Sequence, residues 1–293
     1  FFYDLNQKIT ALKEFTNKNN FSLLISNVAR GLNGAILDRD LKQPSLCIPH
    51  GVISESLDNH DVIYKKIIAE AVFNGESEYF AIQSKIMHQS LNTHKIKGQP
   101  IITGNLIFSN NKNNNNYKKK YLLYATTIKG FTNLQYLGVD MFYEFWEIMK
   151  KLDQFAKNEK KNILVKIHPQ FSECKNDLKR YFRFLTFSNK PIENLLQNAI
   201  SLITLSSGTI EDALNSKVPV ILYDYKKRYK QIECNNDETG AAVFYIDDIE
   251  KLKIVLNNIK VSKKINYEKY VFKGSFNSNF DQKILPLINL KND

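Results

Sequence analysis

Three polar segments combine residue types that can bind phosphate or move a proton. His168-Pro169, Ser206-Ser207-Gly208-Thr209 and Pro49-His50-Gly51 each follow a short apolar run. Imidazole nitrogens, hydroxyls and the backbone N–H groups at a helix start all donate hydrogen bonds to phosphate oxygens. An imidazole also titrates near neutral pH, so a histidine beside a glycine suits general base catalysis. The sequence therefore predicts a phosphate site and a proton-transfer site.

The serine-rich segment is the most informative, because it precedes a predicted helix at 210–215. Free N–H groups at that helix start, together with the hydroxyls of Ser206, Ser207 and Thr209, would surround a phosphate or diphosphate. Glu211 lies one turn further, where its carboxylate could accept two ribose hydroxyl hydrogens. Ordinary helix capping is the alternative, in which a Ser or Thr is the N-cap and Glu211 completes a capping box.

The two histidine turns also have two interpretations each. His168 could donate to a phosphate oxygen of a departing nucleotide, or its ring could simply be hydrogen-bonded within the protein at a strand end. His50 could take a proton as the catalytic base, with Gly51 allowing close approach of a ligand, or be an ordinary turn histidine. Four carboxylates could replace His50 in that role: Asp38, Asp40, Glu55 and Asp58.

Other chemistries lack their residues. The sequence has no Gly-x-Gly-x-x-Gly after a strand, no P-loop, no Gly-x-Ser-x-Gly and no His-Glu-x-x-His. Tyr223-Asp224-Tyr225 is the nearest approach to an Asp-x-Asp metal motif, and it has one carboxylate. Cys47, Cys174 and Cys234 are far apart and have no zinc-type spacing. We therefore predict no metal, no cofactor and a reducing cytoplasm.

The elements that position these residues alternate between short apolar runs and amphipathic runs. Strands are predicted at 21–26, 46–48, 79–82, 100–104, 121–125, 162–167, 184–187, 199–205, 218–223 and 242–246. Helices are predicted at 28–36, 62–73, 86–91, 139–157, 192–196, 210–215 and 247–259. Such alternation is typical of a buried parallel sheet, whose ligands bind beyond the carboxyl ends of the strands.

The length of 293 residues suits about two domains. The Asn- and Lys-rich stretch 109–120 interrupts the alternation, so we predict a flexible linker and hinge there. It separates an N-terminal domain at 1–108 from a C-terminal domain at 121–262, and 263–293 forms a last segment. We predict two doubly wound α/β domains that face a cleft.

The composition narrows the class of partner. The net charge is +11, but arginine is scarce, whereas base readers and phosphate clamps favour arginine over lysine. We therefore predict no nucleic-acid partner, and interpret the surplus as lysine-rich compositional bias with some attraction to anionic ligands or membranes. No apolar run reaches the roughly 18 residues of a membrane span. The start at Phe1 has no Met or signal peptide, so we expect a piece of a longer protein.

Taken together, the motifs resemble those of bacterial GT-B glycosyltransferases and glycerophosphotransferases of surface-polysaccharide synthesis. The similarity covers most of 20–260, and the His-Pro and Ser-Ser pair is similar to that of CMP-sialic acid, CMP-Kdo and CDP-glycerol transferases. It implies a GT-B-like fold of two Rossmann-like domains, with the acceptor on the first and the nucleotide donor on the second. It also implies that the last segment crosses back to the first domain and that the chain lacks the first strands of that domain.

The resemblance assigns roles residue by residue. His168, Pro169 and the Ser206–Thr209 turn would hold the nucleotide phosphates without a metal, and Thr126 would face the nucleotide from the first loop of the donor domain. Gly51 and Glu55 would lie on the acceptor side, beside the base. The implied donor is a CMP-linked Kdo or sialic-acid-type sugar. The implied acceptor is a glycan or lipid-linked glycan of capsule or lipopolysaccharide, reached from the inner membrane face.

Three other functions remain open at this stage. A CDP-glycerol-type polyol-phosphate transferase would use the same phosphate site. A non-hydrolysing nucleotide-sugar 2-epimerase shares the fold and a similar His-Pro and Ser/Gly/Glu pattern. An inactive glycan- or nucleotide-binding subunit of a synthesis complex would keep the site without turnover.

Overall fold

The structure, a computed structural model, describes residues 2–19, 21–27, 44–49, 51, 53–57, 62–108, 119–126, 138–227, 230–273 and 276–289. Its contacts form two compact units, one of Phe1–Ile107 with Tyr270–Asp293 and one of Phe108–Lys269. Most of the predicted linker lies outside the described residues, as does the predicted helix at 28–36. Among the described helices, none is long and apolar enough to cross a membrane.

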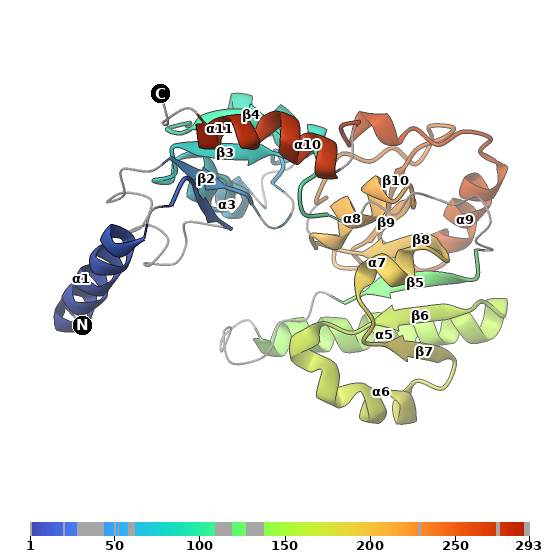
Figure 1. Ribbon diagram of the computed structural model, residues 1–293. Coiled ribbons are helices and arrows are strands. Elements are labelled where there is room, and N and C mark those ends of the chain that lie inside the picture. The colour runs from blue at the N-terminus through green and yellow to red at the C-terminus, as the bar shows by residue number, and fades with distance from the viewer. Residues whose placement is uncertain are drawn as a thin grey trace. The chain divides into compact units, whose positions relative to one another are not determined.

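The first unit contains a four-stranded parallel sheet in the order β1-β2-β3-β4 (Figure 1). The strands are β1 (Leu24–Ser26), β2 (Ser45–Cys47), β3 (Tyr79–Ile82) and β4 (Gln99–Ile102). The helices between them are α3 (Val62–Phe73) and α4 (Lys85–Ser90), the latter followed by the 3-10 turn η1 (Leu91–Thr93). Neighbours in the sheet are also neighbours along the chain, so each crossover moves one strand further.

Both faces of this sheet are covered, because successive strand residues point to opposite sides. Cys47 and Phe80 pack with Phe73 of α3 on one face. On the other face, Leu46 and Ala81 pack with residues near the end of the chain, Ile284 and Leu287. The C-terminal helices α10 (Phe276–Lys283) and α11 (Leu285–Asn289) therefore belong to the first unit, and Figure 1 shows them in red beside β3 and β4.

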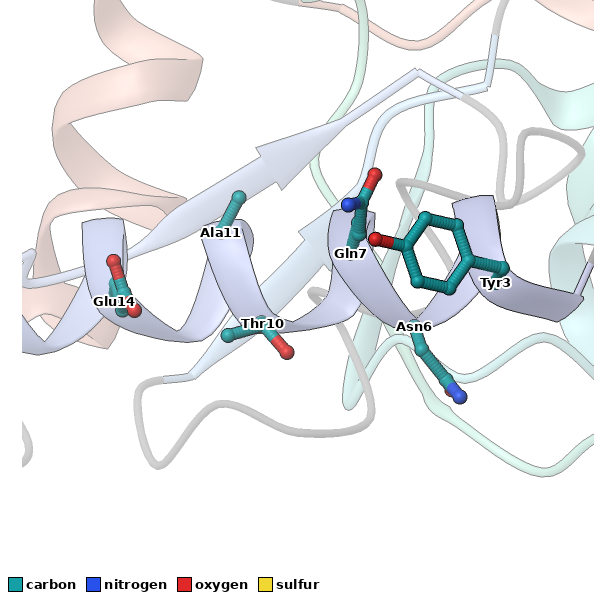
Figure 2. A pocket seen from close by; sticks show the side chains of 6 residues that line it. All are labelled: Tyr3, Asn6, Gln7, Thr10, Ala11 and Glu14. Carbon is teal, nitrogen blue, oxygen red and sulfur yellow. The ribbon is translucent and has the colours of Figure 1, made fainter.

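Helix α1 (Phe2–Lys18) is not among the predicted elements. Its apolar positions Leu5, Ile9 and Leu12 do have helical spacing, but they are few in a polar segment. A hollow of about 330 Å³ lies along this helix. Figure 2 shows the side chains that line it: Tyr3, Asn6, Gln7, Thr10, Ala11 and Glu14. All six side chains come from the single helix, and none is a predicted site residue.

The second unit contains a six-stranded parallel sheet in the order β10-β9-β8-β5-β6-β7. The strands are β5 (Tyr121–Ala125), β6 (Ile163–Lys166), β7 (Leu185–Ser188), β8 (Ala199–Thr204), β9 (Val220–Tyr223) and β10 (Val243–Ile246). Counted along the chain, this is the order 3-2-1-4-5-6 of the dinucleotide-binding α/β fold. Figure 1 shows β5 between β8 and β6, which places the reversal of strand order between β5 and β8.

Helices cover both faces of this second sheet. The side chains of α5 (Gly138–Glu159), α6 (Lys175–Tyr181) and α9 (Lys251–Val261) form one large apolar cluster with alternate strand residues. The shorter helices α7 (Ile192–Leu196) and α8 (Thr209–Asn215) contact β8. Parallel strands that are covered on both faces are apolar throughout, which is why the sequence predicted them as short apolar runs.

Gly104, two residues beyond β4, offers a test of the packing and backbone conformation in the first unit. It has φ +65°, and a Cβ there would lie 2.9 Å from Nδ2 of Asn279, which donates to the carbonyl of Asn105 at 3.0 Å. We expect Gly104→Ala to lower the free energy of unfolding by about 1–3 kcal/mol, measured by urea denaturation. Pairing it with Asn279→Ala removes the clash and leaves the backbone strain. If the free energy of unfolding of Gly104→Ala equals that of wild type, this account is contradicted.

Candidate functional site

The residues predicted to bind phosphate follow three adjacent strands of the second unit. Thr126 comes directly after β5, His168 follows β6, and Ser206 follows β8. Because β6 and β8 flank β5 and all three run parallel, their carboxyl ends meet at one edge of the sheet. The order of the strands reverses between β5 and β8, which is where α/β sheets of this type bind ligands. The structure thus brings these three loops together.

Thr126 fixes the position of the His-Pro turn. Its backbone N–H donates to the carbonyl of Lys166 at 3.2 Å, and its Oγ1 accepts from the backbone N–H of His168 at 3.0 Å. The hydroxyl therefore adds one more rung to the β5–β6 ladder beyond the end of the strands. His168 itself is half-buried, and its carbonyl accepts from Phe171 N–H at 2.8 Å in the 3-10 turn η3 (Pro169–Cys174).

Thr204 makes the corresponding bond on the other side of β5, and sequence reasoning missed it. Its Oγ1 donates to the carbonyl of Ala125 at 3.2 Å, and the side chain is fully buried. A threonine inside an apolar strand looks like an ordinary β-branched residue, so the sequence carries no signal for this role. The end of β5 is thus tied by threonine hydroxyls to both of its neighbours.

The serine-rich turn differs in detail from the expectation of free N–H groups at the helix start. The N–H of Thr209 donates to Ser207 Oγ at 3.3 Å, and the N–H of Ile210 donates to the Ser207 carbonyl at 3.1 Å. These groups are hydrogen-bonded to one another within the turn. Within the described part of the chain, the N–H groups of Ser206, Ser207 and Gly208 have no hydrogen-bond partner. The backbone donors without a partner among the described residues therefore precede the helix.

The capping box with Glu211, one form of the helix-capping interpretation, does not match the geometry of this turn. The N-cap of α8 is Gly208, which has no side chain and makes no side-chain cap. A capping box needs a Ser or Thr at that position, and the serines lie one and two residues earlier. Ser207 Oγ nevertheless accepts from the N–H of Thr209, the first residue of α8, so bonding at the helix start accounts for Ser207 but not for Ser206.

Two side chains of α8 that the sequence singled out have an oxygen that is inaccessible to solvent. Thr209 Oγ1 is inaccessible to solvent and has no hydrogen-bond partner among the described residues. Buried hydroxyls are usually paired, so this one is an exception, and its contact with a phosphate stays a prediction. Glu211 is only 2% exposed, and its contact with a ribose stays a prediction.

Lys166, two residues before His168, supplies a cation close to the His-Pro turn. Its Nζ donates to the Ile167 carbonyl at 2.8 Å. Burial lowers the pKa of this lysine, and the Glu193 carboxylate opposes that shift. On the other side of β8, Asp224 is fully buried after β9, and its carboxylate accepts from Lys226 N–H at 3.3 Å. The described residues contain no cluster of three His, Cys, Asp or Glu that could hold a metal.

The acceptor-side residues follow β2 in the first unit. His50, the predicted base, lies outside the described residues, as do Asp38, Asp40 and Asp58. Gly51 has φ +108°, and no described atom lies within 4 Å of a Cβ built there, so backbone conformation rather than space requires glycine. The Glu55 carbonyl accepts from Lys65 Nζ at 2.7 Å. The roles of His50 and Glu55 stay predictions.

The Thr126 hydroxyl can be tested apart from the histidine ring. We expect Thr126→Val to lower the free energy of unfolding by about 1 kcal/mol, because the N–H of His168 loses its acceptor. It should also weaken nucleotide binding, since the His-Pro turn is released. Thr126→Ser keeps the oxygen and should restore both quantities in urea denaturation and calorimetry. Equal behaviour of the valine and serine variants would rule out this role.

No protein-family model and no curated protein matches this chain. Solved structures do match its fold. The Methanocaldococcus jannaschii UDP-GlcNAc 2-epimerase in complex with UDP-GlcNAc and UDP is 16% identical with a TM-score of 0.57, over 97% of this chain and 80% of that one. S. aureus TarM, with Fondaparinux, alpha-GlcNAc-glycerol and UDP, is 11% identical with a TM-score of 0.56, over 97% and 59%.

The wall teichoic acid polymerase TagF, soaked with CDPG, is 17% identical with a TM-score of 0.52, over 89% of this chain and 67% of that one. The chain spans less than two thirds of the length of TarM. These similarities, together with the two parallel sheets, define the chain as an α/β protein with two Rossmann-like domains of the GT-B type. The predicted fold class is confirmed.

Proposed function

We propose that this protein is a metal-independent glycosyltransferase that uses a nucleotide-activated sugar to build a bacterial surface polysaccharide. The observation that carries the proposal is the meeting of Thr126, His168 and the Ser206–Thr209 turn at the point where the strand order reverses. Among the described residues, the N–H groups of this turn that lack a partner and the Thr209 hydroxyl are candidate donors for phosphate oxygens. The GT-B fold, shared with proteins whose structures hold UDP or CDPG, supports a nucleotide ligand.

The proposed reaction is a displacement at the activated sugar carbon. The sugar carbon gains oxocarbenium character as the acceptor hydroxyl attacks it. The proton of the acceptor hydroxyl passes to His50. The bond between the sugar carbon and the phosphate oxygen breaks, and the nucleotide leaves with the electron pair. His168 and the hydroxyls of Ser206, Ser207 and Thr209 donate hydrogen bonds to the negative charge that develops on the phosphate.

The donor we favour is a CMP-linked Kdo or sialic-acid-type sugar, because the His-Pro and Ser-Ser pair resembles that of the transferases that use it. A CDP-glycerol-type polyol-phosphate donor is the alternative, and the likeness to TagF with CDPG supports it. The proposed acceptor is a glycan or lipid-linked glycan of capsule or lipopolysaccharide. Lysines supply much of the +11 charge and would favour peripheral attachment to an anionic membrane.

Calorimetric titration with CMP, CDP and UDP tests the proposal most directly. We expect one of the three to bind, and its sugar or polyol conjugate to be turned over in the presence of a glycan acceptor. Activity should persist in EDTA, since the proposed phosphate ligands are histidine, hydroxyl and amide groups. Absence of binding by all three nucleotides would refute the proposed site. Binding without turnover would instead indicate an inactive nucleotide-binding subunit.

A nucleotide-sugar 2-epimerase is the second candidate, favoured by the similarity to the M. jannaschii UDP-GlcNAc 2-epimerase. Two structures of that enzyme have TM-scores of 0.57 and 0.53. Incubation with UDP-GlcNAc and no acceptor separates the two functions, because an epimerase converts this substrate alone. Conversion under those conditions would replace the transferase proposal.

A further inference from the structure

The turn between α6 and β7 exposes basic and aromatic side chains together. Six consecutive residues make up this basic-aromatic segment: Lys179, Arg180, Tyr181, Phe182, Arg183 and Phe184. It contains three cations and no carboxylate, and it holds two of the chain's five arginines. Phe182 is buried, whereas the other five side chains are exposed. The proposed reaction uses none of these residues.

The exposed rings of the segment are held in place by neighbouring groups. Tyr181 is 67% exposed, and its ring centroid lies 5.3 Å from that of Trp146 on α5. Phe184 is 48% exposed, and its backbone N–H donates to Asp153 Oδ1 at 2.8 Å. Phe182 anchors the segment between them, because its ring packs edge-on against Trp146 with centroids 4.9 Å apart. A packed part of the second unit thus presents two large rings to solvent.

The cations around these rings have little competing charge within the protein. Arg180 pairs with Asp177 at 3.5 Å, but their side chains are 80% and 67% exposed, and such surface pairs contribute little. No described residue forms a salt bridge with Lys179 or Arg183. Lys157 of α5 adds a fourth cation, with its Nζ 5.6 Å from the ring centroid of the segment's last residue. The surface therefore suits an anionic partner that also has an apolar layer.

An anionic membrane surface is the partner that suits both kinds of group. Basic side chains are attracted to anionic headgroups, and aromatic rings partition into the interface between headgroups and acyl chains. A soluble polyanion would engage the cations and leave both rings in water. Single-stranded nucleic acid would stack on the rings, but the proposed lipid-linked acceptor favours the membrane. We propose that the basic-aromatic segment docks the second unit onto an anionic membrane, with Tyr181 and Phe184 in the headgroup layer.

Sedimentation with lipid vesicles tests the cations. We expect the protein to bind phosphatidylcholine vesicles that contain about 30% phosphatidylglycerol, and not to bind vesicles of phosphatidylcholine alone. Each basic side chain near an anionic surface raises the partition coefficient about fivefold, so Arg180→Gln with Arg183→Gln should lower it about 10-fold or more.

The matched control for the arginine pair is Lys263→Gln with Lys264→Gln. This pair also removes two exposed cations of the second unit, but at a different place in the chain. Charges more than about 10 Å from the membrane are screened, so the control should change binding by about twofold at most. A lysine pair that lowers binding as much as the arginine pair would overturn the inference.

Phe184→Ser tests the rings. It keeps every cation and the backbone bond to Asp153, and we expect binding to fall about fivefold because no ring enters the interface at this position. Phe15→Ser, at a residue of α1 that is 57% exposed, should bind vesicles as wild type does. An unchanged partition coefficient for Phe184→Ser would overturn the inference. So would a protein that binds polyphosphate or single-stranded DNA but no anionic vesicle.

Trp146 gives a signal that needs no variant, since it is the chain's only tryptophan and its ring contacts Tyr181. Brominated lipid quenches tryptophan fluorescence only at short range. On anionic vesicles we expect brominated lipid to lower Trp146 emission below its value on the same vesicles without bromine. Vesicle binding without this quenching would mean that another surface docks, and would overturn the inference.

This inference rests on the proposed function, because it assigns the peripheral attachment proposed there to one surface. Vesicle binding is measured without turnover, so the two proposals can fail separately. If the protein binds anionic vesicles through this segment but neither binds nucleotide nor transfers sugar, the docking surface stands and the proposed function fails. If it transfers sugar but does not bind anionic vesicles, only the inference is overturned.

Discussion

His168→Ala should lower kcat about 100-fold or more while leaving the free energy of unfolding within about 0.5 kcal/mol of wild type. The ring is half-buried at a strand end, whereas the turn itself is held by the backbone bond from His168 N–H to Thr126 Oγ1. Alanine keeps that backbone bond and removes only the ring. A donor that stabilises charge on the departing phosphate acts mainly in the transition state, so kcat should fall more than nucleotide affinity.

Steady-state kinetics and urea denaturation measure the two sides of this prediction. His88→Ala is the matched control, because His88 is an exposed histidine on α4 in the other unit. It should leave kcat unchanged. Near-normal turnover of His168→Ala would contradict the proposed phosphate role of the His168 ring. A large decrease in the free energy of unfolding would mean that the ring stabilises the fold instead.

Thr209→Val should increase the free energy of unfolding by about 1 kcal/mol and weaken nucleotide binding about 10-fold. The Oγ1 of Thr209 is inaccessible and has no partner among the described residues, so the free protein gains from its replacement by a methyl group of similar shape. A bound nucleotide would lose a hydrogen bond to its phosphate. Opposite signs for stability and affinity are typical of a residue kept for binding rather than for folding.

Ser201→Ala is the matched control for the Thr209 variant. Ser201 lies within β8, is fully buried, and its hydroxyl also lacks a partner among the described residues. It should change stability in the same direction and leave nucleotide affinity unchanged, as measured by calorimetry. If Thr209→Val binds nucleotide as tightly as wild type, the turn does not use this hydroxyl for phosphate.

Local sequence was sufficient for most of the elements. The predicted strands 79–82 and 121–125 and the predicted helix 62–73 coincide with β3, β5 and α3. Their apolar runs are bounded by clear polar or turn residues, which fixes both period and length. Helices α1 and α6 were missed because their few apolar residues lie among many charged and polar ones. So few apolar positions give only a weak helical periodicity in the sequence.

What the sequence by itself determined is the set of chemical groups and their place after strands: the His-Pro turn, the serine-rich turn and Thr126. Only the tertiary structure decided that β5 lies between β6 and β8, that the Thr126 hydroxyl accepts a hydrogen bond from His168 N–H, and that the Gln83 amide donates to the Pro49 carbonyl. Strand ends and turns are encoded by neighbouring residues. Strand order and side-chain bonds to distant backbone groups depend on contacts between residues far apart in the chain, which no local pattern contains.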